Sequence, residues 1–339
     1  MNQLTKVRNV NSNFLIDSFG RKIRYIRMSV TDRCDFRCVY CMNEDMRFLP
    51  RDDVLTLEEL GRIASVFSEL GVEKIRLTGG EPLVRKDITQ LTDYIGTLGF
   101  NDFTMTTNGS QLVHYAQQLK QCGLTRLNIS LDSLDQDKFH KITRTGYLDK
   151  VIKGIDAAIT QGFESIKINT VIMKGRNDDE VLNLVEFARD RNIDISFIEE
   201  MPIGIVTDHS RKETFCSSDE VKSIIEQRYA LKNSNIKTSG PSRYFTMQDS
   251  STKVGFISPY SHNFCSECDR VRITAEGRLL LCLGNEHSID LRSILRSKKN
   301  SNQALKSAIS NAILLKPEQH LFDQDNHIQV LRLMNMTGG

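Results

Sequence analysis

Residues 23–41 read IRYIRMSVTDRCDFRCVYC, and this stretch decides the fold. Its first part, Ile23–Thr31, has the alternation and the β-branched and aromatic residues that predict a β-strand. Its second part places Cys34, Cys38 and Cys41 in a loop directly after that strand. In α/β folds, ligand chemistry collects at the carboxyl ends of parallel strands, so the loop is a candidate site.

The same alternation of strand and helix continues to about residue 201. Five further strands are predicted, over Lys74–Gly79, Asp102–Asn108, Arg126–Asp132, Ser165–Met173 and Asp194–Met201. Amphipathic stretches between them predict helices, over Thr56–Leu70, Gln111–Cys122, Leu148–Thr160 and Asp178–Asp190. Repeated βα units imply a parallel sheet with right-handed crossovers, and hence an α/β barrel or part of one.

Helix start signals support this reading. Thr56 with Glu59 predicts a capping box, and Asn177 before an acidic turn predicts an N-cap. After Pro202 the rhythm changes, and a third start signal, Ser217 with Glu220, opens a helix over Ser217–Arg228. Other elements of this part are predicted over Arg243–Met247, Lys253–Pro259, Leu291–Lys298 and Asn302–Leu314. We divide the chain into a flexible segment (1–20), a barrel part (21–201) and an extension that covers the barrel mouth (202–339).

Composition and charge exclude several classes of protein. The net charge of +2 argues against a nucleic-acid binder, which is normally basic along one face. The chain has no apolar run near the roughly 18 residues that span a bilayer, and residues 1–20 have no apolar signal-peptide core. We therefore expect a cytoplasmic protein without a membrane or nucleic-acid partner. In a reducing compartment, its eight cysteines are ligands or thiols rather than disulfides.

The first cysteine group has the spacing Cys34-x3-Cys38-x2-Cys41. Such closely spaced thiolates favour a soft metal. Structural zinc needs a fourth ligand, and none lies nearby in sequence, so a zinc site would have to be completed from far away. A 4Fe-4S cluster held by three cysteines instead keeps one iron open for a chelating ligand.

This spacing, with Tyr40 before the last cysteine, resembles the signature of the radical S-adenosylmethionine (SAM) superfamily. The resemblance implies that the open iron chelates SAM, and that reduction by the cluster yields a 5′-deoxyadenosyl radical. Thr78–Pro82 resembles the superfamily's GGEP motif, in which paired glycines allow close approach and Glu81 offers an acceptor for an ammonium. By the same matching, the SAM-binding residues are Tyr40, Gly80, Ser130 and Met201.

A second group, Cys265-x2-Cys268-x13-Cys282, follows later in the chain. The Glu276-Gly277 pair predicts a β-hairpin that returns Cys282 to the other two cysteines. Three cysteines again suit an open cluster. A zinc knuckle with His262 as the fourth ligand remains the alternative on spacing alone.

Basic side chains accompany both groups. Arg270 and Arg272 alternate on one strand face beside the second group, a pattern that suits bidentate binding of phosphate or carboxylate. Arg27, Arg76 and Lys167 lie on predicted strands at positions that point inward. Charges inside a barrel are costly unless an anion pairs with them, so five converging cations imply a polyanionic substrate.

Together these features resemble one family, the GTP 3′,8-cyclases of molybdenum cofactor biosynthesis. The resemblance runs from Ile23 to the end of the chain. It includes Thr106-Thr107-Asn108-Gly109, Lys-Ile-Asn-Thr at 167–170, Cys-x2-Cys-x-Arg-x-Arg, Gly240-Pro241 and a tail with Arg332, Met334 and a terminal Gly-Gly. It implies an incomplete (βα)6 radical SAM barrel with a C-terminal α+β extension, SAM and two 4Fe-4S clusters. The implied GTP contacts are Arg27, Arg76, Thr106, Lys167, Arg270, Val271 and Arg272.

The family also implies the chemistry. The radical abstracts the ribose H3′ of GTP, and the C3′ radical attacks C8 of a guanine bound at the second cluster, which makes the enzyme a lyase. Catalytic roles fall to Arg27, Arg270, Arg272, Gly338 and Gly339, because the tail reaches back to the arginines. The expected partners are GTP and an electron donor such as flavodoxin or ferredoxin, and the expected state is a monomer or homodimer. Another radical SAM enzyme with an auxiliary cluster is the alternative.

The match departs from the family at two positions. Ser196 stands where the sixth strand of the family usually carries an arginine. This predicts weaker phosphate binding unless a neighbouring cation such as Arg243 compensates. Thr337 replaces the usual apolar residue before the double glycine, which is a milder change.

Overall fold

The structure is a computed structural model, and it describes residues 14–236, 240–298, 300–320, 322 and 330–338. Six parallel strands form its centre. They are β1 (Tyr25–Ser29), β2 (Lys74–Thr78), β3 (Asp102–Thr107), β4 (Arg126–Ser130), β5 (Ser165–Ile172) and β6 (Asp194–Glu199), paired in chain order. All six predicted strands are therefore confirmed, each ending one to two residues earlier than expected.

Alternation along these strands separates two environments. One set of side chains packs into the hydrophobic core under the helices, including Ile26, Met28, Ile75, Leu77, Phe103, Met105, Leu127, Ile129, Ile166, Ile168, Ile195 and Phe197. The other set faces the interior of the curved sheet and is mostly polar. Because successive side chains of a strand point to opposite faces, the apolar set fixes which side chains face inward.

The part of the chain after residue 201 continues the sheet at both edges. Strand β10 (Arg270–Ile273) pairs in parallel with β1, and β9 (Ser250–Ile257) pairs in parallel with β6. Antiparallel strands follow outward: β11 (Arg278–Leu280) and β12 (Ser288–Asp290) beyond β10, and β8 (Arg243–Met247) and β7 (Lys232–Asn233) beyond β9. The result is one 12-stranded sheet. The division at residues 201 and 202 stays a prediction.

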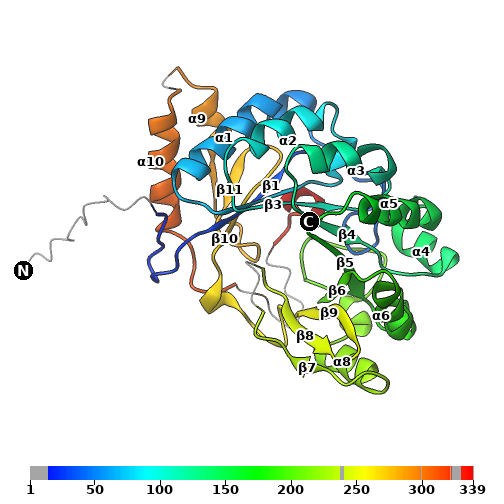
Figure 1. Cartoon of the computed structure of the whole chain (residues 1–339). Coiled ribbons are helices and arrows are strands. Elements are labelled where there is room, and N and C mark those ends of the chain that lie inside the picture. Colours follow the sequence, from blue (N-terminus) through cyan, green and yellow to red (C-terminus); the bar gives the residue numbers. More distant parts are fainter. Residues whose placement is uncertain (1–13, 237–239, 299, 321, 323–329, 339) are drawn as a thin grey trace, which may run out of the picture.

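Helices cover the outer face of the sheet, and the C-terminal helix lies inside its curve (Figure 1). The α-helices are α1 (Leu57–Glu69), α2 (Ile88–Gly96), α3 (Leu112–Gln121), α4 (Gln136–Thr143), α5 (Leu148–Thr160), α6 (Val181–Asp190), α7 (Arg211–Thr214), α8 (Ser218–Glu226), α9 (Leu291–Leu295), α10 (Asn302–Ile313) and α11 (Met334–Thr337). Short 3-10 helices are η1 (Arg51–Asp53), η2 (Pro82–Val84), η3 (Asp178–Glu180) and η4 (Cys265–Glu267). No helix within the described ranges is long and apolar enough to cross a bilayer.

Two of the three predicted helix starts are confirmed. Thr56 with Glu59 and Ser217 with Glu220 form complete capping boxes. The third is confirmed in position only: Asn177 is the N-cap residue of η3, before the acidic turn, but its side chain makes no capping hydrogen bond. The Asn177 side chain is buried, donates to the carbonyls of Asp132 and Val171, and accepts from the backbone N–H of Met173. The side chain gives hydrogen bonds to two backbone carbonyls that would otherwise be buried without a donor. It is therefore not available to cap the helix.

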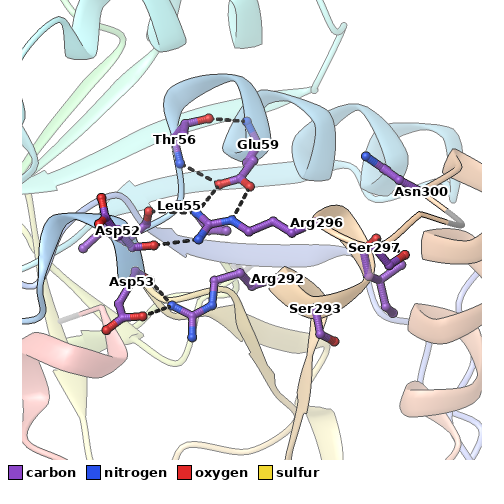
Figure 2. Close-up of polar contacts among 12 residues, drawn as sticks. Asp52, Asp53, Leu55, Thr56, Glu59, Arg292, Ser293, Arg296, Ser297 and Asn300 are labelled. Carbon is purple, nitrogen blue, oxygen red and sulfur yellow. Dashed lines mark hydrogen bonds and ion pairs between the residues drawn. The ribbon is translucent and has the colours of Figure 1, made fainter.

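The C-terminal part is attached to the barrel through the start of α1 (Figure 2). Arg296 binds the Glu59 carboxylate, with Nε 2.7 Å from Oε1, and Arg292 Nη1 lies 3.0 Å from Asp53 Oδ1. Arg296 also donates to the backbone carbonyl of Asp52 at 2.6 Å. Glu59 therefore serves twice, since the same carboxylate accepts the Thr56 backbone N–H of the capping box.

This double role predicts the effect of substitutions at Glu59. Glu59→Ala removes the side-chain half of the box and the ion pair, and should lower the free energy of unfolding by about 1–2 kcal/mol. Glu59→Gln can still accept the Thr56 N–H and should lose roughly half as much. Lys153→Ala, in an exposed pair with Asp149, serves as the control. Urea unfolding followed by circular dichroism measures all three, and equal stability of Glu59→Ala and Lys153→Ala would contradict the role of Glu59.

Candidate active site

The inward-facing side chains line one large cavity, whose empty volume up to its open mouth is about 2100 Å³. All six cysteines of the two groups border it. So do the predicted SAM-binding residues Tyr40, Gly80, Ser130 and Met201 and the predicted substrate-binding residues Arg27, Arg76, Thr106, Lys167, Arg270, Val271 and Arg272. The structure therefore brings together side chains that are as far as about 250 positions apart in the chain. The carbonyl oxygen of Gly338 accepts hydrogen bonds from Arg27 and Arg272. Gly339 lies outside the described residues.

The first cysteine loop rests on the loop after β2. Gly80 donates its backbone N–H to Thr31 O at 2.7 Å, and Glu81 donates to Arg33 O at 2.8 Å. A Cβ at Gly80 would lie 2.4 Å from the Arg33 carbonyl oxygen, so only glycine fits. The paired glycines therefore allow two backbones to touch, and this contact sets the position of the Cys34–Cys41 loop.

The expectation that Glu81 offers an acceptor to a bound ammonium is wrong. Glu81 is fully buried, and its carboxylate accepts from Thr107 Oγ1 at 2.7 Å and from the backbone N–H groups of Asn108 and Leu83. Burial raises the pKa of this carboxyl to about 8 although those hydrogen bonds oppose the shift. Glu81 holds the ends of β2 and β3 together, because its carboxylate accepts hydrogen bonds from donors that follow both strands.

Asp132 lies beside the first triad, where its Oδ2 accepts from Tyr40 Oη at 2.7 Å. Glu199 and Glu200 also border the cavity, but Glu200 is paired with Arg211 and Glu199 accepts the backbone N–H groups of Ser218 and Tyr260. Burial, and then the charge of Asp132, raises the pKa of the Cys38 thiol far above its ordinary value; burial raises that of Cys41 to about 12. This end of the cavity suits a cationic ligand. A free thiolate would be unstable in this buried position. A thiolate bound to a metal is more stable there, because the metal replaces the solvation that burial removes.

The second triad sits on the predicted hairpin. Strands β10 and β11 pair antiparallel around Gly277, which has a φ of +89°. Burial raises the pKa of the Cys268 thiol, but the charges of Arg270 and Lys316 outweigh burial and bring it below its ordinary value. The electrostatic surroundings of the two triads are thus opposite in sign. A hairpin with cations beside it fits an anionic iron–sulfur cluster.

The zinc alternative for the second triad loses its fourth ligand. His262 Nε2 lies 3.1 Å from both Asp219 carboxylate oxygens, on the outside of the molecule. Among the described residues, no three His, Cys, Asp or Glu side chains converge as the ligands of a single ion would. A 4Fe-4S core needs no such convergence, because each cysteine binds a different iron. The cysteines of each triad lie near one another, since their charges perturb each other's pKa.

Cations dominate the other end of the cavity. Asp102 balances Lys74 and lies 3.7 Å from Arg126 Nη1. In the part of the chain that the structure describes, no carboxylate lies within ion-pair distance of Arg76, Lys167 or Arg270. Several buried polar atoms facing this space also have no hydrogen-bond partner there, namely Arg76 Nε, Thr106 Oγ1, Asn128 Nδ2 and Asn169 Oδ1. Unpaired buried charges and donors point to an anionic ligand with several oxygen atoms.

Tyr25 reports the strength of this positive potential. It lies on β1, two residues before Arg27, and is almost completely buried. Burial alone would raise the pKa of its phenol, but the charges of Arg76, Arg27, Lys74 and Arg270 lower that pKa to about 8. The same crowding, after burial, lowers the pKa of Arg27 to about 10.

The C-terminal tail connects the two ends of the cavity. Gly338 O accepts from Arg27 Nη2 at 3.0 Å and from Arg272 Nη1 at 3.1 Å. Asn335 Nδ2 donates to Asp32 O at 3.0 Å, beside the first cysteine loop. Gly338 has a φ of +82°, and a Cβ there would lie 2.4 Å from Thr78 Oγ1, so two independent constraints require glycine. The tail thus holds the cysteine loop and the arginines in one arrangement.

Ser196 lies on the inner face of β6, because Ile195 and Phe197 point to the outer core, but it does not border the cavity. It is fully buried, and its hydroxyl lies 2.9 Å from Ser242 Oγ. Arg243 is exposed and does not border the cavity, so the expected compensation is wrong. Strand β8 turns Tyr244 inward instead, because neighbouring residues of a strand alternate, and Lys167 Nζ donates to Tyr244 Oη at 3.1 Å.

Sequence reasoning missed several cavity residues. Asn128 and Asn169 share the inward alternation of Arg126 and Lys167, and that pattern would have found them. Other missed residues border the second triad from loops, where no periodicity exists: Phe264, Lys316, His320 and Phe322. Their positions depend on contacts made far away in the chain.

Two family models match the chain. The model of the radical SAM superfamily matches residues 28–188, and the model for molybdenum cofactor synthesis, C-terminal part, matches residues 193–322. A protein of Marinobacter nauticus named GTP 3′,8-cyclase is 60% identical over 325 residues, which cover 96% of this chain and 98% of the relative. A protein of the same name from Pseudomonas putida is 58% identical over 331 residues, covering 97% and 99%.

Solved structures show the fold at much lower identity. The crystal structure of Streptococcus suis SuiB aligns with a TM-score of 0.59 at 18% identity and covers 80% of this chain and 64% of its own. SuiB bound to S-adenosylmethionine aligns with a TM-score of 0.55 at 19% identity, covering 85% and 69%. With the family models, these likenesses confirm the predicted α/β partial barrel.

The lowered pKa of Tyr25 predicts how anion binding depends on pH. Above about pH 8 the phenol becomes a phenolate, which adds a negative charge beside the cations. The affinity of the metal-free protein for tripolyphosphate should therefore fall as pH rises from 7 to 9, by roughly fivefold relative to Tyr25→Phe. Calorimetry on both proteins separates this step from the titration of the ligand itself. If the two proteins lost affinity for tripolyphosphate in parallel as the pH rises, ionisation of Tyr25 would have no effect on binding and the prediction would be refuted.

Proposed function

The chain belongs to the GTP 3′,8-cyclases of the radical SAM superfamily, and we propose that its cavity carries out that reaction with the residues described above. The protein converts GTP and SAM into (8S)-3′,8-cyclo-7,8-dihydroguanosine 5′-triphosphate, 5′-deoxyadenosine and methionine, the first step of molybdenum cofactor biosynthesis. It uses SAM and two 4Fe-4S clusters. One observation carries the assignment of the site: a single cavity is bordered by two cysteine triads, the first beside Asp132 and the second beside Arg270 and Lys316.

The electrostatic contrast matches the two small molecules. SAM carries a sulfonium and an ammonium, and GTP carries a triphosphate. A cation is best held near Asp132, and a polyanion near the cations of β1, β2 and β10. We therefore place SAM on the first triad (Cys34, Cys38, Cys41) and the guanine of GTP on the second (Cys265, Cys268, Cys282).

The SAM half works by positioning. When its cluster and SAM are bound, this half supplies the electron and the 5′-deoxyadenosyl radical that remove a hydrogen from the ribose. Tyr40 is fixed by Asp132 at the edge of the site, and Gly80 keeps the cysteine loop in place. Ser130 and Met201, at or beyond the ends of β4 and β6, border the same space. A fixed ligand geometry shortens the distance that the reactive group has to bridge.

The GTP half binds charge. We assign the triphosphate to Arg27, Arg76, Lys167, Arg270 and Arg272, and a further hydrogen bond to Thr106 Oγ1. The backbone of Val271 borders the cavity between the two arginines. Guanidinium groups suit phosphate because they donate two parallel hydrogen bonds. The pKa of Lys167 is lowered by burial, and a bound phosphate would restore it.

The cellular compartment, the electron donor and the oligomeric state are also proposals. Free thiols at all eight cysteines fit the reducing cytoplasm, with a flavodoxin or ferredoxin as the electron donor. Nothing in the charge balance calls for a nucleic-acid or membrane partner, and the protein acts as a monomer or homodimer. A different radical SAM enzyme with an auxiliary cluster is the competing function, and substrate choice separates the two.

Anaerobic turnover tests the function directly. The reconstituted protein is incubated with SAM, dithionite and each nucleoside triphosphate in turn. Formation of 5′-deoxyadenosine and cyclised product with GTP alone is expected, because the relatives that the chain matches over nearly its whole length are GTP 3′,8-cyclases. Arg76→Met and Lys167→Met should raise the KM for GTP at least about tenfold, the effect of one lost charge-assisted contact. Lys153→Met, on the surface, is the control, and equal turnover of ATP would reject the proposal.

The tail gives a second test. Deleting Gly338 and Gly339 removes the carbonyl that Arg27 and Arg272 share but leaves the cysteine loops and the core unchanged. We expect unaltered folding and iron content with turnover lost, measured by circular dichroism, iron analysis and product formation. Normal product formation by the shortened protein would show that the tail has no part in the reaction.

A further inference from the structure

Lys316 follows helix α10 and lies beneath the hairpin that carries the second triad. Its residue surface is only 3% exposed, and it borders the cavity. Its Nζ donates to Arg270 O at 2.9 Å and to Leu281 O. One acceptor lies two residues after Cys268, and the other directly precedes Cys282. A single ammonium therefore joins the two strands at the points where two cysteine ligands leave them.

Lys316 differs in its charge balance from Lys74 and Arg21, and resembles the cavity cations Arg76, Lys167 and Arg270. Lys74 has Asp102 as its partner, and Arg21 has Asp17 at 2.6 Å. Within the described ranges of the chain, no carboxylate lies within ion-pair distance of Lys316. Backbone carbonyls satisfy its donors but supply no full negative charge. A buried ammonium without a counter-ion is costly, so its position calls for an anion nearby.

The nearest anions that the site can form are the cysteine thiolates. The Nζ of Lys316 is held by the carbonyls of Arg270 and Leu281, two residues after Cys268 and one residue before Cys282, so its charge lies beside both ligands. The three cysteines bring three negative charges to a cluster, more than the two positive charges of an oxidised 4Fe-4S core. A fixed cation beside them lowers the energy of that excess.

The backbone around Lys316 is held rigidly in place. Arg21 donates to the carbonyls of Cys265 at 2.8 Å, Pro317 at 2.6 Å and Glu318 at 2.7 Å. The backbone N–H of His320 lies 3.4 Å from Cys265 Sγ. The segment from Lys316 to His320 is therefore attached to the remaining ligand of the triad. Because this segment is anchored on both sides, the ammonium cannot easily move away from the hairpin.

We propose that Lys316 is a positioning and charge-compensating residue of the second iron–sulfur site. Its hydrogen bonds hold Cys268 and Cys282 at the separation that the cluster needs. Its charge stabilises the more negative, reduced form of the cluster, and so makes the cluster easier to reduce. This inference rests on the proposed function, which places a cluster on Cys265, Cys268 and Cys282.

The reduction potential tests the role of the charge apart from turnover. The full chain is used with Cys34, Cys38 and Cys41 replaced by alanine, so that only the second triad can hold a cluster. Lys316→Met and Lys316→Arg are compared in this background. Lys306→Met is the matched control, because Lys306 is a cation of the preceding helix α10 that pairs with Glu69 on the surface. Iron analysis and a potentiometric titration followed by electron paramagnetic resonance give cluster content and midpoint potential.

We expect Lys316→Met to keep its cluster and to be harder to reduce. At a fixed potential its ratio of reduced to oxidised cluster should fall about tenfold, which corresponds to about 59 mV for a one-electron couple. Lys316→Arg and Lys306→Met should stay close to the parent. An unchanged potential in Lys316→Met with a full cluster would overturn the inference.

Other outcomes also decide the matter. If Lys316→Met binds no iron, Lys316→Arg supports the inference when it restores both iron and potential, and overturns it when it fails in the same way. A purely structural lysine would alter iron content or thermal stability without moving the potential of the cluster that remains. If the parent background itself binds no cluster, the proposed function fails at the second triad, and the inference about Lys316 is overturned with it.

Discussion

The structure depends on one constraint: cations that leave water on the inner face of a sheet need an anion. The outer side chains of β1 to β6 pack against helices, so the period of two forces Arg27, Arg76 and Lys167 inward. Asp102 neutralises only Lys74 and Arg126. Burial and mutual repulsion then lower the pKa values of Arg27, Lys167 and Arg272. A polyanionic ligand bound beside these cations would relieve their mutual repulsion.

The same constraint explains why the tail enters the cavity. The carbonyl oxygen of Gly338 accepts hydrogen bonds from two of the crowded guanidinium groups and partly satisfies them. A side chain at this position would collide with Thr78, so the backbone itself has to approach. On its other side the tail contacts the first cysteine loop through Asn335. The segment that contains α11 therefore connects the arginines of β1 and β10 with the first cysteine loop.

Local rules predicted much of this site. The spacing of Cys34, Cys38 and Cys41 and the inward alternation of the basic residues need only neighbouring sequence, and both identified cavity residues. Pairing of β10 with β1 and of β9 with β6 could not be predicted, because no local pattern states which distant strand forms an edge. Lys316 was missed for the same reason. Glu81 was misread because its polar partners, Thr107 and Asn108, come from a strand end that meets it only in the folded chain.

Ser196 shows how packing limits where the cations stand. It lies opposite Gly255 on β9, and a Cβ on Gly255 would be 2.5 Å from Ser196 Oγ and 2.2 Å from Ser242 Oγ. Three small residues thus close this corner, and it has no space for a guanidinium. The small Ser196, in place of a cation on β6, therefore belongs to a tightly packed contact between the barrel and the extension. Most cations that border the cavity therefore stand on the edge formed by β10, β1 and β2, where the tail also binds two of the guanidinium groups.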